Sequence, residues 1–261
     1  MERSHKFGII AAFFLIAFCA VRLDAAEFRL DNEIRPGNVK STTYLLDGDF
    51  FSMIGQNGEI TYYDSKAKTF SILDPALRLQ TRLDLGETKD KIELLRQEIL
   101  NSPKLEAGSF NAFVVKPIFQ SEFDENSGDW ALWSPWFDYV METAVFPNAD
   151  AARQYNDFCD LSCHLNYRIA YSKSMLVRLE VNKLLAARSR FPKKISVTIY
   201  PNGKSPLTKS EKMESAHVLV VRLTEEDRQR ITQAREALRT FPAVTFSEYE
   251  RKVAEKIKPG K

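Results

Sequence analysis

Hydrophobic and polar positions alternate over short runs in the part of the chain from Ser41 to Asp84. The runs STTYLLDGDFFSMI, EITYYD, TFSILD and LQTRLD are separated by GQNG, SKAK and PALR. Runs of β-branched and aromatic residues that are broken by Gly, Asn, Asp and Pro are typical of strands joined by turns. Because these connections are too short to hold a crossover helix, the pattern predicts an antiparallel meander.

The apolar spacing becomes helical over Lys89–Asn101, and Pro103 follows the predicted end of that helix. Its apolar face consists of Ile92, Leu95, Ile99 and Leu100. A second β-rich block follows at residues 110–146. Within it, the segment DENSGD is a hairpin signal, so strands are expected on both sides of it.

The second half of the chain combines helices with a further pair of strands. Helices are predicted at about 149–171 and 174–189, and Pro192 ends the second. ISVTIYPNG is a predicted strand that runs into an Asn-Gly turn, and HVLVVRL is its expected partner. Thr224 precedes three acidic residues, which is typical of the start of a helix, and this helix is expected to reach Thr240.

Together these elements predict an α+β fold. An antiparallel curved sheet, in the form of a meander or a half-barrel, would pack against the inserted helices. No low-complexity linker or repeat interrupts the chain. Residues 27–261 are therefore expected to form a single domain.

The start of the chain has the pattern of a secretory signal. An apolar run over residues 7–21 is preceded by basic residues and closed by charged ones. The run is shorter than the roughly 20 residues that a spanning helix needs. We therefore expect residues 1–25 to be a signal peptide cleaved near Ala25, which leaves a secreted or periplasmic protein without a transmembrane span. A retained membrane anchor and a lipid attached to Cys19 are the alternatives.

The net charge and the absence of catalytic motifs argue against several classes of function. The chain has 37 Lys and Arg against 35 Asp and Glu, a net charge of +2, which gives no reason to expect a nucleic-acid partner. It contains no GxSxG, HExxH or glycine-rich phosphate loop, and its mature part holds two imidazoles, His164 and His217. The sequence therefore predicts a non-enzymatic protein without a cofactor. An enzyme that uses carboxylates alone stays open.

The densest chemical motif is CDLSCH at residues 159–164. It resembles the CxxCH haem-attachment pattern but contains one additional residue. Candidates for a sixth iron ligand are Met175, Met213 and His217. On a helix, Cys159 and Cys163 lie about 40° apart on an apolar flank, and His164 lies about 140° from Cys159. Haem or structural metal binding by all three residues therefore requires the helix to break, and no metal site is predicted.

A disulfide between Cys159 and Cys163 is a separate hypothesis. Exported proteins often pair an even number of cysteines. Cα atoms four residues apart on a helix are about 6 Å from each other, which a disulfide can span, but the parallel Cβ vectors would strain it. A bonded pair, two packed thiols and an intermolecular bond all remain open.

The aromatic segment at residues 130–139 is a candidate for ligand binding. If it is one strand, Trp133, Phe137 and Tyr139 share one face. Trp130 and Trp136 share the other. Exposed aromatic side chains bind apolar or carbohydrate ligands, whereas core packing is the simpler role. The carboxylates around DENSGD are too few for a calcium loop and suit a polar turn.

The meander resembles a group of uncharacterised exported proteins from planctomycete-type bacteria. Asp47-Gly48, Tyr63-Asp64 and Leu73-Asp74-Pro75 carry the resemblance, which covers about a fifth of the chain. Similarity is weaker through the helices and TEEDRQRI. The resemblance implies a shared fold and export, and no known activity.

More remotely, the same strands are similar to those of outer-membrane lipoprotein carrier proteins. In those proteins a curved antiparallel sheet packs on helices and encloses lipid. They begin with a helix before the sheet, whereas the mature part of this chain is expected to start directly in strands. The similarity therefore implies an architecture and no particular ligand residues.

Three functional hypotheses follow. The first is an exported protein that binds a lipid or a lipidated partner in an apolar cleft of the curved sheet, with Trp133, Phe137 and Tyr139 as ligand-binding residues. The second is a structural or interaction protein of the cell envelope that has an envelope protein partner and no small-molecule site. The third is a haem-type redox protein that uses CDLSCH.

Overall fold

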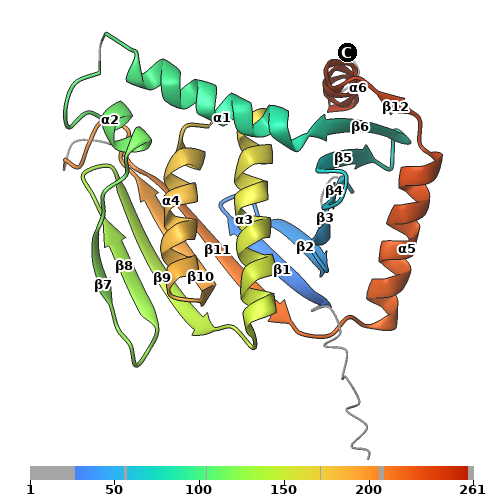
Figure 1. Cartoon of the computed structure of the whole chain (residues 1–261), viewed down its shortest axis with the longest axis horizontal. Coiled ribbons are helices and arrows are strands. Elements are labelled where there is room, and N and C mark those ends of the chain that lie inside the picture. Colours follow the sequence, from blue (N-terminus) through green and yellow to red (C-terminus); the bar gives the residue numbers. More distant parts are fainter. Residues whose placement is uncertain (1–26, 56–57, 104, 171, 206–208, 258–261) are drawn as a thin grey trace, which may run out of the picture.

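A computed structural model describes residues 27–55, 58–103, 105–170, 172–205 and 209–257, without the side chains of 168–170 and 257. The signal-peptide prediction for residues 1–25 lies outside this range. The described residues form a 12-stranded open sheet in the order β12-β6-β5-β4-β3-β2-β1-β11-β10-β9-β8-β7, with helices packed on it (Figure 1). The α+β class and the curved antiparallel sheet are thus confirmed.

The strands of the first half are β1 (Glu27–Arg35), β2 (Val39–Leu46), β3 (Asp49–Ile54), β4 (Ile60–Asp64), β5 (Thr69–Asp74) and β6 (Leu79–Asp84). Those of the second half are β7 (Gln120–Phe123), β8 (Asp129–Trp133), β9 (Phe137–Val145), β10 (Arg190–Ile199), β11 (Glu211–Val220) and β12 (Ala243–Val244). The helices are α1 (Leu85–Leu100), α2 (Phe110–Val115), α3 (Ala149–Ala170), α4 (Ser174–Ala187), α5 (Glu225–Thr240) and α6 (Phe246–Ile257).

Short turns with specific chemistry produce the meander. At the β2–β3 turn, Asp47 (φ 51°) and Gly48 (φ 92°) both adopt the left-handed conformation that a two-residue hairpin loop requires. At the β4–β5 and β5–β6 turns, the side chains of Asp64 and Asp74 accept hydrogen bonds from the backbone amides two and three residues further on. The three residue groups that carry the resemblance to exported proteins therefore lie at or beside hairpin turns.

Strand β1 joins the two halves of the sheet. It pairs antiparallel with β2 on one side and with β11 on the other. Strands β10 and β9 then follow β11, so the segments before α1 and after α4 become neighbours in space. As a result, a single curved surface faces α3 and α4.

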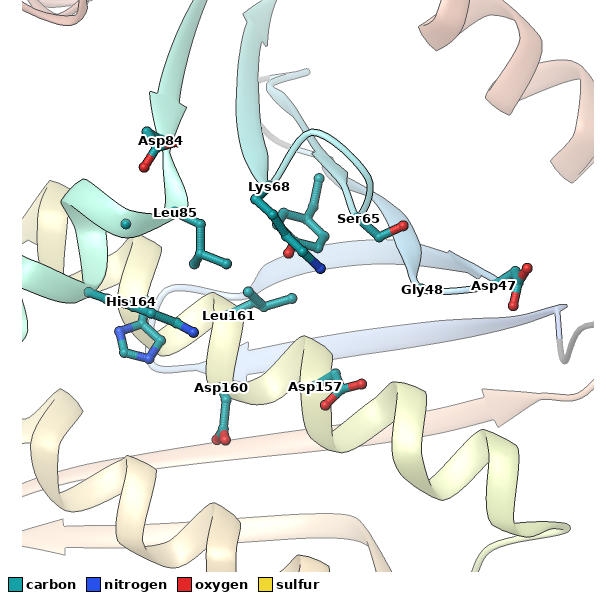
Figure 2. A pocket seen from close by; sticks show the side chains of 13 residues that line it. Asp47, Gly48, Ser65, Lys68, Asp84, Leu85, Asp157, Asp160, Leu161 and His164 are labelled. Carbon is teal, nitrogen blue, oxygen red and sulfur yellow. The ribbon is translucent and has the colours of Figure 1, made fainter.

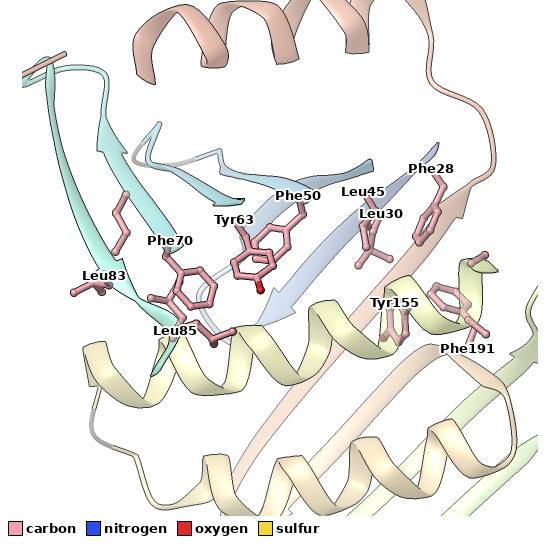
Figure 3. Close-up of a cluster of buried hydrophobic side chains, with 14 of the residues drawn as sticks. Phe28, Leu30, Leu45, Phe50, Tyr63, Phe70, Leu83, Leu85, Tyr155 and Phe191 are labelled. Atoms are coloured by element: carbon pink, nitrogen blue, oxygen red, sulfur yellow. The ribbon is translucent and has the colours of Figure 1, made fainter. Parts of the chain in front are cut away.

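Helices cover both faces of the first half of the sheet, because successive strand residues point to opposite sides. On β3, Phe50 faces α3 and contacts Phe158 edge to face, with ring centroids 5.0 Å apart. The next residue, Phe51, faces the opposite side and packs with Ile231 of α5. Figure 3 shows the cluster between the strands and α3, which includes Tyr155.

The second half has one covered face. Trp130 and Leu132 of β8, together with Tyr139 and Met141 of β9, are buried against α4 and α2. On the opposite face Val140 is 59% exposed. Figure 1 shows α3 and α4 side by side on the covered face, with α1 lying across their ends.

Helix predictions were largely confirmed, with differences at the ends. Thr224 caps α5 through a capping box with Asp227. Helix α1 begins four residues earlier than expected, because Asp84 caps it by accepting from the amide of Glu87. Leu100, assigned to the apolar face, is 46% exposed.

Two local predictions were wrong. Residues 110–115 form helix α2 instead of a strand, because the Ser109 side chain accepts from the amide of Ala112 and starts a helical turn. Pro192 does not end a helix but lies inside β10, at an irregularity in its pairing with β9. Residues 27–35, which follow the expected cleavage site, form strand β1, as the sequence predicted.

Candidate functional site

The central strands carry small and polar residues on the face that looks toward α3. Ser41 and Thr43 of β2, Ser52 of β3 and Thr61 of β4 occupy positions where neighbouring core residues are large and apolar. These side chains cannot fill the distance between the sheet and the helix. The result is a cleft between the sheet and the helices α3 and α4.

This cleft has two lobes. The larger, about 390 Å³, lies between strands β1 to β4 and α3. The smaller, about 200 Å³, lies under α4 against strands β9 to β11. Residues common to both lobes are Asn32, Ile34, Met175, Arg178 and His217. The larger lobe alone is within the range of about 300 to 1,000 Å³ that is usual for small-molecule sites.

Apolar side chains line most of the larger lobe. The sheet contributes Leu30, Ile34, Val39, Phe50 and Ile54, and the helices contribute Tyr155, Phe158, Leu165 and Met175. This lining suits an alkyl chain or another apolar group.

Arg178 of α4 places a positive charge between the two lobes. Its Nε donates to Asn182 Oδ1 at 2.8 Å, and Asn182 Nδ2 donates to Asp160 Oδ1 of α3 at 2.9 Å. Among the described residues, no carboxylate lies within ion-pair distance of the Arg178 guanidinium. Asn182 thus fixes the orientation of the arginine without neutralising it.

His217 of β11 faces the same region of the cleft. Burial, together with the nearby charge of Arg178, lowers the pKa of His217 to about 4, so the ring is neutral at neutral pH. Its Nε2 lies 2.9 Å from Ser215 Oγ, and its Nδ1 is buried without a hydrogen-bond partner in the described structure. The Oδ1 atom of Asn32, directly opposite on β1, is also without one. Beside Arg178, the cleft therefore has two buried polar atoms, one on His217 and one on Asn32, that are available to hydrogen-bond a ligand.

The cysteines of CDLSCH lie on the cleft side of α3, and both are free thiols. The structure therefore does not contain the disulfide between Cys159 and Cys163 that was one option. Burial raises the pKa of Cys159 and raises that of Cys163 to about 12. As expected for a helix, His164 lies on another side of α3, where it lines a different pocket. The helical break that a haem site would need is not present.

The predicted aromatic residues do not share one face. A turn separates Trp133 on β8 from Phe137 and Tyr139 on β9, and Trp133 pairs with Asp138. Trp133 therefore points to the opposite side of the sheet from Phe137 and Tyr139. The error came from treating two strands as one. Of the three, Tyr139 lines the smaller lobe, and Phe137 is fully buried in the core against Phe110 and Phe113.

A second, polar hollow of about 780 Å³ lies on the other side of α3, between that helix, the β4–β5 turn and the start of α1 (Figure 2). Its charged residues have both signs: Asp47, Asp84, Asp157 and Asp160, with Lys68 and Lys89. Burial, and to a smaller extent Lys89, lowers the pKa of His164 to about 4. Figure 2 shows Asp160 pointing away from Lys68, consistent with its hydrogen bond to Asn182.

Within the described part of the chain, no group of three or more His, Cys, Asp or Glu side chains has an arrangement that could hold a metal ion. None of the helices described there is both long enough and apolar enough to span a membrane. Comparison of the chain with protein-family models and with curated proteins finds no match.

Sequence reasoning named several residues that line the cleft but missed Arg178, Asn182 and the small strand residues, although two signals were present. Arg178 and Asn182 interrupt the otherwise apolar side of α4, where a charged residue at a core-facing helical position is unusual. In the strands, Ser41, Thr43 and Ser52 occupy the inward positions of an alternating pattern. Small polar residues at inward positions of neighbouring strands indicate a cavity once the pairing of the strands is known.

Proposed function

We propose that this chain is an exported, non-enzymatic protein that binds a lipid or the acyl chain of a lipidated partner in the cleft between the curved sheet and the helices α3 and α4. The observation that carries the proposal is the apolar cleft itself. Its space exists because the small side chains on one face of the central strands do not reach helix α3, which lies opposite them. A core selected only for stability would fill such a space, because cavities in a packed interior are destabilising.

The ligand-binding part of this proposal is tested by filling the larger lobe. Purified protein is extracted with organic solvent for bound lipid and analysed by native mass spectrometry, and binding of dodecanoate and dodecanol is measured by calorimetry. Ser52→Phe places an aromatic ring in the lobe and is expected to abolish binding. Ser196→Phe makes the same substitution on β10 beside the exposed Val140, so it is expected to bind like the original protein.

Binding that is unchanged in Ser52→Phe, or a protein that carries and takes up no lipid, would contradict the proposal. Capture of one specific envelope protein by such a ligand-free chain would favour the structural or interaction role instead. Circular dichroism of both phenylalanine variants confirms that they remain folded.

Export is the second part of the proposal and rests on the apolar run of residues 7–21. Expression of the full chain in a bacterium with an outer membrane is expected to yield a periplasmic or secreted product that begins near residue 26. Amino-terminal sequencing and intact mass measure the cleavage site. A cytoplasmic product of full length would contradict this part alone.

A further inference from the structure

Arg178 is a half-buried cation that lines both lobes of the cleft and forms no ion pair with a described carboxylate. The titratable groups that influence it most are Cys159, Tyr155, Cys163 and Tyr139. Burial raises the pKa of each of these groups above its usual value, to about 12 for Cys163 and Tyr139. All four are therefore neutral at neutral pH, as is His217, which adjoins Arg178 from β11.

The carboxylates nearest to the cleft are engaged elsewhere. Asp160 accepts a hydrogen bond from Asn182, which stands between it and the guanidinium. Glu59, at the β4 end of the larger lobe, accepts from Tyr249 Oη at 3.3 Å. Glu214, beside the smaller lobe, forms an ion pair with Lys212 at 2.8 Å. Burial raises the pKa of Asp160, and the charge of Arg178 partly offsets this rise, but none of the three carboxylates forms an ion pair with Arg178.

A guanidinium that is partly withdrawn from water without a counter-charge lowers the stability of a folded protein, because no ion pair offsets its desolvation. Here Asn182 holds the Nε of this guanidinium, so the side chain is oriented although it is not neutralised. The terminal nitrogens of an arginine match the two oxygens of a carboxylate or a phosphate. An anion that enters the cleft would supply the missing charge.

We propose that the cleft takes a single-chain amphiphile with an anionic head group, a carboxylate or a phosphate, whose head forms an ion pair with Arg178 while its alkyl chain lies in the apolar larger lobe. This inference rests on the proposed lipid-binding function and specifies its ligand. His217 Nδ1, buried beside Arg178 and without a partner in the described structure, is placed to contribute a further hydrogen bond to the head group. Asn182 is a positioning residue, because it acts through Arg178.

The test compares four ligands with the same alkyl chain. Dodecanoate, dodecyl phosphate, dodecanol and dodecyltrimethylammonium are titrated into the mature protein in the calorimeter, below their micellar concentrations. We expect dodecanoate or dodecyl phosphate to bind about tenfold to a hundredfold more tightly than dodecanol. The cationic amphiphile is expected to bind more weakly than the alcohol. The stronger of the two anions identifies the head-group chemistry.

Arg178→Gln removes the charge and retains a hydrogen-bonding side chain. In this variant we expect dodecanol to bind as in the original protein and the preference for the anions to disappear. Retained binding of dodecanol also shows that the variant is folded. Arg178→Lys is expected to keep part of the preference, because a lysine supplies the charge without the two-pronged geometry. Arg153→Gln, at an exposed position of α3, is the control and should leave all four affinities unchanged.

The outcomes separate this inference from the proposed function. Equal affinity for all four ligands, or a preference for anions that survives in Arg178→Gln, would overturn the anionic head group and leave lipid binding intact. Absence of binding by all four ligands would overturn both.

Discussion

At the scale of single residues, the two cysteines of CDLSCH illustrate how position decides reactivity. Both thiols face the cleft from α3, and burial raises the pKa of each, to about 12 for Cys163. The thiolate is the reactive species, so a raised pKa suppresses alkylation and oxidation at neutral pH. The two thiols of this motif, which looks the most reactive in the sequence, are therefore expected to react slowly in the folded protein.

We predict that the native protein reacts slowly with iodoacetamide and contains no internal disulfide. Intact mass after alkylation at pH 7.5, with and without reductant, should show few modified thiols until denaturant is added, after which Cys159 and Cys163 are both modified. A native protein that fails to react even in denaturant unless reductant is present would contain the disulfide and would contradict the structure.

A second residue-scale prediction concerns Gly128 in the β7–β8 turn. Its φ is +78°, and a Cβ at this position would lie 2.7 Å from the carbonyl oxygen of Thr143. Gly128→Ala is therefore expected to lower the free energy of unfolding by about 2 to 4 kcal/mol, through both backbone strain and steric overlap. Urea denaturation followed by circular dichroism measures this change.

Gly108→Ala is the matched control, because Gly108 has nearly the same φ, +79°, and open space around the added methyl group. Its expected cost is about 1 kcal/mol, which reflects strain alone. Equal costs for the two variants would show that the contact with Thr143 relaxes freely.

At the scale of secondary-structure elements, α5 depends on one side chain for its position on the sheet. Asp227 completes the capping box with Thr224 and also accepts two hydrogen bonds from Arg29 of β1, at 3.1 and 3.2 Å. The same carboxylate therefore starts the helix and links it to the central strand of the sheet. The sequence predicted the cap, but it could not predict the link, since Arg29 lies almost 200 residues away in the chain.

Asp227→Ala is expected to lower the free energy of unfolding by about 2 kcal/mol, since it removes a helix cap and one partner of a partly buried ion pair. Glu226→Ala is the control in the same helical turn. The side chain of Glu226 is 72% exposed and pairs with Arg230 on the surface, so its loss should cost less than about 0.5 kcal/mol. Chemical denaturation that gives similar values for the two variants would argue against the link to β1.

Predictability from the sequence differed between kinds of element. The meander and the helices α3 to α5 follow from local patterns, because turns and caps are encoded by neighbouring residues such as Asp47 and Gly48. Strand β1 was expected only as a start in strands, without bounds, and the residues of α2 were expected to form a strand. The bounds of β1 are set by its pairing with β2 and β11, while α2 is built from residues that favour strands. Long-range pairing decided the first case, and the local cap by Ser109 decided the second.

At the scale of the whole molecule, the cleft arises where two hydrophobic clusters meet. One cluster lies between α3 and the first strands, and the other lies between α4 and strands β8 to β10. At the junction the packing is polar and includes Arg178, Asn182 and His217. No local pattern encodes such a junction, because its residues come from β1, β11, α3 and α4. The candidate site therefore could not be predicted before the strand order was known.

This junction makes stability depend on pH. The pKa of His217 is about 4 in the folded protein, below the usual value of about 6.5 for an unfolded chain. Between these two values the unfolded state binds more protons than the folded state, so stability falls as the pH decreases from about 6.5 to about 4. The groups around the ring are Arg178 of α4, which opposes protonation, and the uncharged Asn32 and Ser215.

We predict that His217 lowers the free energy of unfolding by about 1 to 3 kcal/mol across this range. The lower part of this interval allows for solvent screening, because the ring is partly exposed. His217→Gln cannot be protonated and should lose less stability over the same interval, measured by urea denaturation at pH 6.5 and at pH 4.5. Carboxylates with raised pKa values, such as Glu59 and Asp160, act in the opposite direction. They remain in both proteins, so the difference between the two profiles isolates the histidine. Parallel profiles would mean that His217 reaches water easily, and that the junction between the two clusters is more open than its packing indicates.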